Sequence, residues 1–221
     1  MIAFGCAVSD PAVYERLAGP GIERAAEPGS PLFISTGLPI RDAYNEILDE
    51  AAILPGLEAL VLLHQDFELT DDSLPGRVRQ IFADPRVGLA GSLGARDVTL
   101  HLWLSSRELY GAVAAPGIDR RFSSGPQEVE GVDGALLVLA PWVVRGLRFG
   151  GVEAGGFHGY DVDIAMRVRA YGGTVICDDI PHFHHREPKD DYEAQRHAGI
   201  VLARMWDPAL RPPEWGPAFQ L

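Results

Sequence analysis

The amino-acid sequence predicts an α/β protein with a mainly parallel central sheet covered by helices on both faces. Short apolar runs alternate with helical patterns, as they do in such proteins. The run at residues 60–63 contains no polar residue, which is typical of a central strand buried from both sides. The six predicted strands are residues 2–8, 32–35, 59–63, 87–93, 135–139 and 174–177.

Two helices are predicted around the first strands. Asp10 before Pro11 places a helix N-cap next to a proline in the first helical position, which predicts a helix over residues 11–18. We expect the Gly-Pro-Gly sequence at residues 19–21 to end this helix. Over residues 40–52 apolar side chains recur at helical spacing with acidic side chains on the other side, which predicts an amphipathic helix.

The remaining chain is less regular. Residues 94–127, which include Trp103, follow no single period, so we expect irregular structure with one or two added strands. This segment is either an insertion that shapes a substrate pocket or a plain surface excursion. Prolines in residues 206–221 predict an extended tail. We therefore expect one domain over residues 1–205, with the tail packed on it.

Composition limits the function classes. The chain has 19 Lys and Arg against 31 Asp and Glu, and a net charge of -12 opposes the phosphate contacts of nucleic-acid binding. No apolar run approaches the ~20 residues of a membrane span, and the first residues do not form a signal peptide. We expect a soluble, cytoplasmic protein. Cys6 and Cys177 lie in apolar strands and are expected to be buried, reduced thiols.

The first polar group, His64, Gln65 and Asp66, follows the predicted strand at residues 59–63. In open parallel sheets ligands bind just beyond the carboxyl ends of strands, so Asp66 is expected to point into a crevice. A carboxylate there can hold Mg²⁺ or Mn²⁺, which neutralises a diphosphate leaving group. The alternative is that Asp66 caps a turn while nearby acidic residues solvate a loop.

The second group is a glycine-rich segment, residues 155–159, that opens onto a predicted helix. Asp161 shares one helix face with the apolar residues at i+3, i+4 and i+7, so we expect it to look inward. Asp163 is predicted instead to pair with Arg167 on the helix surface. Asp161 is therefore either a stabilising acid at a helix N-terminus or a general base for an acceptor hydroxyl.

The third group contains His182, His184 and His185, which follow an apolar strand. In an extended segment His182 and His184 share one side while His185 faces the other. A neutral imidazole is a common metal ligand and can complete a site begun by Asp66. The alternatives are surface histidines or a compact zinc site, and no cysteine partner or helical His-Glu-x-x-His pattern supports the zinc site.

In this order, the three groups resemble the family 2-like glycosyltransferases of the GT-A fold, in particular the small branch whose metal motif reads His-Gln-Asp. The resemblance extends from about residue 2 to residue 185 and implies a Rossmann-like, three-layer sandwich. Its specific parts are Tyr44-Asn45, His64-Gln65-Asp66, Val132-Asp133-Gly134 and His158-Gly159-Tyr160-Asp161-Val162-Asp163 with Arg167.

The resemblance implies roles for individual residues. Asp66 matches the last aspartate of the metal motif, and Asp161 matches the catalytic base of inverting members. His184 or His185 matches a histidine that helps bind metal or diphosphate. The residues expected to meet the donor nucleotide and sugar are Ser9, Asp10, Asn45, Gln65, Asp133 and Gly134.

The implied activity is the transfer of a sugar from a nucleoside-diphosphate sugar to a saccharide or other hydroxyl-bearing acceptor. Among such donors, a UDP-sugar is the one expected. The implied cofactor is Mn²⁺ or Mg²⁺, and the implied outcome is inversion. His64 departs from the family pattern, because the metal motif usually begins with an aspartate. The alternatives are a non-catalytic sugar- or nucleotide-binding module, a nucleotidyltransferase and, less favoured, a metallohydrolase.

Overall fold

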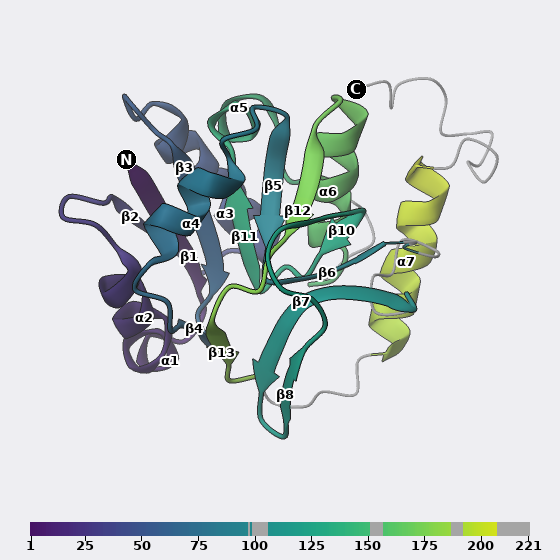
Figure 1. The fold of residues 1–221 in the computed structure, drawn as a ribbon, viewed down its shortest axis with the longest axis horizontal. Helices are drawn as coiled ribbons and strands as arrows, with labels where there is room; N and C mark the ends of the chain where they lie inside the picture. Colours follow the sequence, from purple (N-terminus) through teal and green to yellow (C-terminus); the bar gives the residue numbers. More distant parts are fainter. Residues whose placement is uncertain (97, 99–105, 151–156, 187–191, 207–221) are drawn as a thin grey trace.

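The computed structural model describes residues 1–96, 98, 106–150, 157–186 and 192–206 (Figure 1). Its centre is a seven-stranded sheet. The strands lie in the order β2 (Leu32–Thr36), β1 (Ile2–Val8), β3 (Ala59–His64), β11 (Leu136–Leu139), β5 (Val87–Gly91), β12 (Thr174–Cys177) and β9 (Gln127–Val129). Two smaller sheets contain β10 (Gly131–Val132), β6 (Leu93–Arg96), β7 (Glu108–Ala115) and β8 (Ile118–Arg121), and β13 (His182–His184) with β4 (Phe67–Leu69).

The central sheet is mostly parallel, as predicted. β1 pairs in parallel with β2 and β3, and β12 pairs in parallel with β5. β11 runs antiparallel between β3 and β5, and β9 runs antiparallel to β12 at the edge. β2, β1, β3, β5 and β12 therefore all end at one edge of the sheet, where β11 begins.

Helices cover both faces and complete three layers. Side chains of β3 alternate between the faces: Leu60 and Leu62 belong to one core cluster, and Val61 and Leu63 to the other. The first cluster packs against α3 (Ile40–Ala52), α5 (Pro141–Gly146) and α6 (Tyr160–Ala170). The second packs against α2 (Ala18–Ala25) and α4 (Leu74–Ile81). This double burial explains the uninterrupted apolar run predicted as a central strand.

The first helical region differs from the prediction. Asp10 caps α1 (Pro11–Arg16), as expected, by accepting hydrogen bonds from the backbone of Ala12 and Val13. The Gly-Pro-Gly sequence at residues 19–21, however, lies inside α2 and does not end the helix. A proline in the first turn of a helix loses no helical hydrogen bond. A Cβ on Gly21 would lie 2.6 Å from the Leu69 backbone nitrogen, so close packing against β4 requires glycine there.

The irregular segment contains three strands, β6, β7 and β8, which is more than the one or two added strands expected. The predicted strand at 87–93 is interrupted at Ser92, where the chain passes from the central sheet to the second sheet. Trp206, expected to begin the tail, is the last residue of α7 (Tyr192–Trp206). Trp103, the glycines at positions 155 and 156 and residues 207–221 lie outside the described residues, so the predicted tail stays a prediction.

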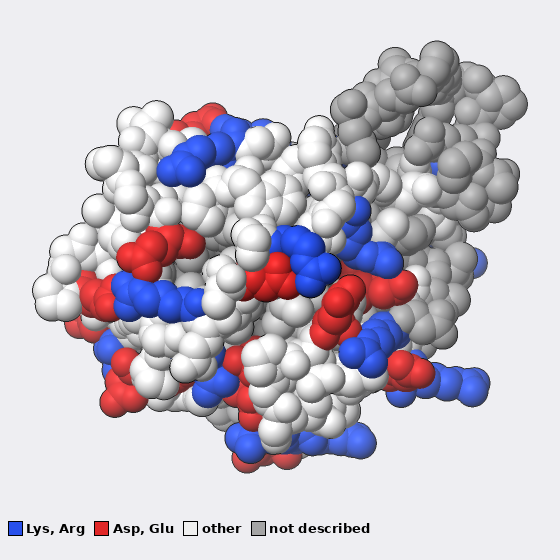
Figure 2. All heavy atoms as spheres, turned by 45° about the horizontal axis from the view of Figure 1, so that its top comes forward, with Lys and Arg blue, Asp and Glu red and all other residues white. Residues whose placement is uncertain are grey.

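Charged side chains of both signs cover the described surface. Figure 2 shows basic side chains interspersed with acidic ones over the described part of this face. In the described ranges, no helix has the length and apolar character needed to cross a membrane. Cys6 and Cys177 are buried free thiols, as predicted. Burial raises the pKa of Cys6 to about 12, which keeps the thiol protonated.

Candidate active site

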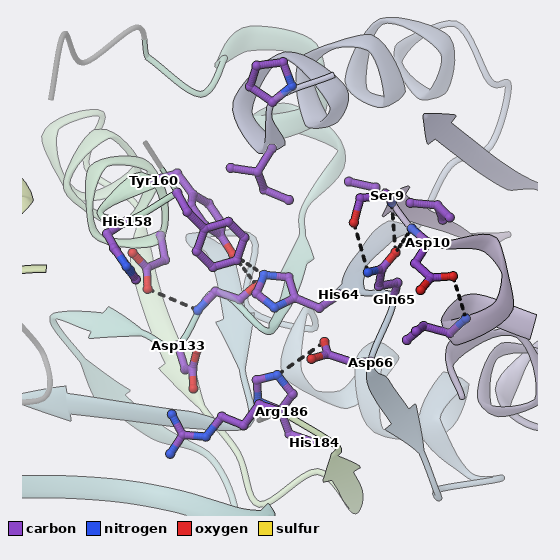
Figure 3. Close-up of a pocket in the computed structure, with 18 of the residues that line it drawn as sticks. Ser9, Asp10, His64, Gln65, Asp66, Asp133, His158, Tyr160, His184 and Arg186 are labelled. Atoms are coloured by element: carbon purple, nitrogen blue, oxygen red, sulfur yellow. Dashed lines mark hydrogen bonds and ion pairs between the residues drawn. The ribbon is translucent and has the colours of Figure 1, made fainter. Parts of the chain in front are cut away.

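A cavity of about 990 Å³ opens at the edge of the central sheet where β1 and β3 end. The start of β11, the N-terminus of α6 and the end of β13 complete its wall (Figure 3). The three polar groups of the sequence, although far apart in the chain, therefore meet at one place. The predicted site residues that line this cavity are Ser9, Asp10, Gln65, Asp66, Asp133, Gly134, Asp161, His184 and His185.

His64, Asp66 and His184 form a group that can hold a metal ion. One ligand atom from each residue lies within 4.8 Å of the other two. β13 pairs antiparallel with β4, and this pairing carries His184 beside the turn that holds Asp66. His184 Nε2 lies 3.5 Å from Asp66 Oδ1. Two imidazoles and one carboxylate are suitable ligands for a divalent transition-metal ion, so the donor set fits the expected cofactor.

The electrostatics of this group favour cation binding. Burial, together with the neighbouring His184, lowers the pKa of His64 to about 4, so its imidazole is neutral at physiological pH. Burial opposes ionisation of Asp66, but the hydrogen bond from His184 and electrostatic interactions with His184 and His64 outweigh it and lower the Asp66 pKa. A neutral imidazole and an ionised carboxylate are the protonation states that a metal ion requires.

The other two histidines of the cluster have different partners. His185 Nε2 lies 3.0 Å from Glu68 Oε2, so its imidazole is engaged by Glu68. His182 is buried, stacks on Phe67 and lies 2.7 Å from the Ile180 carbonyl oxygen through Nδ1. Of the three, His184 is therefore the one whose ring lies in the metal-binding group.

Tyr160 connects His64 to Gly134 at the start of β11. The Tyr160 hydroxyl lies 2.5 Å from His64 Nε2 and donates a hydrogen bond of 2.9 Å to the Gly134 carbonyl oxygen. A Cβ on Gly134 would lie 2.4 Å from the Tyr160 hydroxyl oxygen, so only glycine leaves room for it. In Figure 3, His64 lies between Tyr160 and Asp66.

Asp161 lies at the first turn of α6, beside the start of β11. Its Oδ2 accepts a hydrogen bond of 3.1 Å from the Gly134 backbone, and its Oδ1 accepts one of 2.9 Å from Val162. Burial, and then the charge of Asp133, raise the Asp161 pKa to about 6, although these hydrogen bonds act in the opposite direction. A buried carboxylate with a raised pKa on a cavity wall is typical of a general base.

Gln65 joins the end of β3 to the loop that follows β1. Its Oε1 accepts hydrogen bonds of 2.8 Å from the backbone of both Ser9 and Asp10, and its Nε2 donates one of 3.0 Å to Ser9 Oγ. The Asp10 carboxylate is occupied with capping α1. Gln65 and Asp10 therefore shape this part of the cavity through the backbone.

Asn45 has a different place from the one expected. It does not belong to the cavity wall among the described residues. Its Nδ2 donates a hydrogen bond of 3.0 Å to the Phe149 carbonyl, and its Oδ1 accepts one of 2.8 Å from the Phe149 backbone nitrogen. Both ends of the carboxamide hold the chain after α5 against α3, and the contact of Asn45 with a donor stays a prediction.

Asp163 pairs with Arg167, as predicted, but the expectation of a surface pair was wrong. Arg167 Nε donates a hydrogen bond of 2.9 Å to Asp163 Oδ2, and Asp163 is fully buried. Trp206 Nε1 and the Gly150 backbone also donate to this carboxylate. The packing of α7 and of the chain before α6 buries the pair, which helical spacing alone does not indicate.

Two of the cavity residues have roles that the sequence does not predict. His64 belongs to the first polar group but is not predicted as a metal ligand, and Tyr160 belongs to a family motif without a predicted role of its own. Their shared position on the wall depends on the approach of β3 to α6, for which the sequence carries no local signal. The further lining side chains with chemical or recognition potential are Arg16, Leu38, Phe157, His158 and Arg186.

One curated protein is similar to this chain in sequence. No family model matches the chain. It is 36% identical over 191 residues to the streptomycin biosynthesis protein StrF of Streptomyces griseus, an alignment that covers 85% of this chain and 67% of that protein.

Solved structures show the same fold. GalNAc-T7, solved with UDP, GalNAc and Mn²⁺, matches with a TM-score of 0.59 at 10% identity, over 86% of this chain and 44% of that chain. A197 from STIV matches with a TM-score of 0.54 at 11% identity, over 84% of this chain and 86% of that chain. The chain therefore has the GT-A glycosyltransferase fold, as predicted.

Proposed function

The chain belongs to the family of the streptomycin biosynthesis protein StrF, and from that premise we propose that it is a glycosyltransferase of the inverting, family 2-like type. The proposed reaction moves a sugar from a nucleoside-diphosphate sugar to an acceptor hydroxyl, and the proposed donor is a UDP-sugar. One observation carries the proposal: the metal-binding group around Asp66 and the buried carboxylate of Asp161 lie on the wall of a single cavity.

His64, Asp66 and His184 are the proposed ligands of the metal. A divalent cation bound there supplies positive charge to the diphosphate that departs with the nucleoside. Two of the three donors are imidazole nitrogens, which suit transition metals better than Mg²⁺. We therefore propose Mn²⁺ rather than Mg²⁺. GalNAc-T7, which shares the fold, was solved with Mn²⁺.

Asp161 is the proposed general base. Its carboxylate takes the proton from the acceptor hydroxyl as that oxygen bonds to the anomeric carbon and the bond to the diphosphate oxygen breaks. The carboxylate is held in place by backbone hydrogen bonds from Gly134 and Val162. A pKa raised to about 6 makes it a stronger base than an exposed aspartate, while it stays ionised at neutral pH.

The loop after β1 is the proposed contact for the nucleoside. Gln65 bonds the Ser9 and Asp10 backbone to the strand that leads to Asp66. The position of the proposed nucleoside site is therefore fixed relative to the proposed cation site. Asp133 and Gly134 lie where the donor sugar and the acceptor are proposed to meet. The relative's name places that protein in streptomycin biosynthesis, and we propose a biosynthetic role for this chain too.

Purified protein tests the proposal. Nucleoside diphosphates and their sugars are screened by thermal shift with and without Mn²⁺, because a ligand that binds the native state raises the unfolding temperature. We expect a Mn²⁺-dependent shift with one donor class, and sugar transfer or slow donor hydrolysis with the same donor.

Two variants serve as controls in this screen. Asp66→Ala should lose the Mn²⁺-dependent shift, and Asp161→Asn should keep the shift but lose transfer. Donor binding without turnover would indicate a non-catalytic binding module, and release of pyrophosphate would indicate a nucleotidyltransferase. Either outcome contradicts the proposed transferase.

A further inference from the structure

The Tyr160 hydroxyl has one proton to share between two neighbours. It donates a hydrogen bond of 2.9 Å to the Gly134 carbonyl oxygen and lies 2.5 Å from His64 Nε2. A carbonyl oxygen is an acceptor only, so the bond to Gly134 uses the single hydroxyl proton. The hydroxyl oxygen must then act as the acceptor toward His64.

This arrangement determines the tautomer of His64. If the Tyr160 oxygen accepts, His64 Nε2 carries a proton, and the neutral ring keeps its lone pair on Nδ1. In the opposite tautomer, His64 Nε2 would accept the hydroxyl proton of Tyr160. The hydroxyl oxygen would then face the Gly134 carbonyl oxygen with no proton between the two acceptors. The nitrogen left to a cation at Asp66 and His184 is therefore Nδ1.

The surroundings hold Tyr160 in this position. Its ring is buried, with 3% of the residue exposed, and contacts the rings of Tyr44 and Phe149. A Cβ on Gly134 would lie 2.4 Å from the hydroxyl oxygen, so Gly134 is the residue type that allows the contact. Groups that fix the tautomer and orientation of a metal-bound imidazole commonly change metal affinity 10- to 100-fold when mutated.

We propose that Tyr160 is a positioning residue that fixes His64 as the Nε2-protonated tautomer and so makes His64 Nδ1 a ligand of the cation. The proposal rests on the metal site proposed above and adds a residue that does not touch the cation. Through Gly134, Tyr160 also connects this site to Asp161, because the Gly134 backbone nitrogen donates to the Asp161 carboxylate.

Mn²⁺ binding to the full chain, measured by calorimetry and by electron paramagnetic resonance without any donor, tests the proposal. Tyr160→Phe removes only the hydroxyl and should weaken Mn²⁺ binding about 10- to 100-fold. Tyr44→Phe is the matched control. Its hydroxyl is equally buried in the same aromatic cluster but has no hydrogen-bond partner among the described residues, so Mn²⁺ affinity should not change.

A second measurement reads the tautomer itself. Nitrogen–proton correlation NMR of the labelled, metal-free chain at slightly alkaline pH distinguishes a proton on Nε2 from one on Nδ1. We expect His64 to be Nε2-protonated in the wild type and in Tyr44→Phe, and to show a mixture of tautomers in Tyr160→Phe. A purely structural role of the hydroxyl would not change this signature.

The outcomes separate the inference from the function on which it rests. Unchanged Mn²⁺ affinity in Tyr160→Phe, or an Nδ1 proton on His64 in the wild type, would overturn the role of Tyr160 while leaving the transferase proposal intact. A wild-type chain that binds no Mn²⁺ would overturn the metal site itself and this inference with it. That failure is recognisable because it occurs in the wild type.

Discussion

The Gly134 backbone nitrogen donates a hydrogen bond of 3.1 Å to Asp161 Oδ2, which fixes the carboxylate of α6 against the start of β11. Asp161 is buried, and Asp133 precedes Gly134 in the chain. The negative charge of Asp133 therefore opposes ionisation of Asp161. The same contact thus holds a candidate base in place and leaves it in surroundings that raise its pKa to about 6.

The first prediction concerns the pH dependence of transfer. A base must be ionised, so the turnover number should fall as the pH decreases through about 6, the pKa of Asp161. Asp161→Asn should lower turnover by about 10²- to 10⁴-fold, and its residual rate should lack this acidic limb. Steady-state kinetics across the pH range check both points. A variant that keeps the wild-type profile would exclude Asp161 as the base.

The second prediction concerns stability. The folded-state pKa of Asp161 lies above its ordinary value of 3.8, so its contribution to folding is fully present below pH 3.8 and is lost as the pH rises through about 6. Asparagine cannot ionise and avoids this loss. A pKa difference of roughly two units corresponds to about 3 kcal/mol in the free energy of unfolding at neutral pH, which the variant regains. The asparagine amide cannot accept one of the two backbone hydrogen bonds, and this loss costs the variant about 1 kcal/mol.

Asp161→Asn should therefore be more stable than the wild type at neutral pH, by about 2 kcal/mol in the free energy of unfolding. In acid, where the wild-type carboxyl is protonated, this advantage should be lost, and the missing hydrogen bond should leave the variant about 1 kcal/mol less stable than the wild type. Urea unfolding at several pH values measures it. A variant that is less stable at neutral pH would show that the hydrogen bonds of the carboxylate outweigh the cost of burying its charge.

Much of the architecture could be predicted because its signals are local. The unbroken apolar run of β3 and the helical spacing of α3 follow directly from burial, and both elements lie where the sequence places them. The position of Asp66 beyond β3 follows from the rule that parallel sheets bind ligands at their carboxyl ends. Local periodicity and strand direction were enough to place one wall of the cavity.

The rest depends on contacts between distant segments. α2 continues through a Gly-Pro-Gly sequence because Gly21 packs against β4, which is far along the chain. His184 joins His64 and Asp66 only because β13 pairs with β4. The spacing of residues in the sequence does not reveal these pairings. The family resemblance indicated Asp66 and a histidine of the third group as metal ligands, and only the geometry identified His64 as a further candidate ligand.

The third prediction separates two neighbouring histidines. His184→Ala removes a member of the metal-binding group and should weaken Mn²⁺ binding by at least about 100-fold. His185→Ala should leave Mn²⁺ affinity close to that of the wild type, because its imidazole pairs with Glu68. Calorimetric titration of both variants with Mn²⁺ makes the comparison. Equal losses in the two would mean that His185 turns toward the cation.

The fourth prediction concerns Gln65 and the loop after β1. Gln65→Leu removes the acceptor shared by the Ser9 and Asp10 backbone, two hydrogen bonds worth about 1 kcal/mol each. We expect the KM for the donor to rise about 5- to 30-fold, with a small change in kcat, because the loop is proposed to hold the nucleoside and not the reacting atoms.

Gln65→Glu is the matched control for this variant. Glutamate has the same length and keeps an acceptor oxygen for the backbone of Ser9 and Asp10, while Ser9 Oγ can reverse its hydrogen bond and donate to the second oxygen. Its KM should therefore stay near the wild-type value. If Gln65→Glu raises KM as much as Gln65→Leu, the Gln65 carboxamide contacts the donor directly, and the role assigned to it through the loop is wrong.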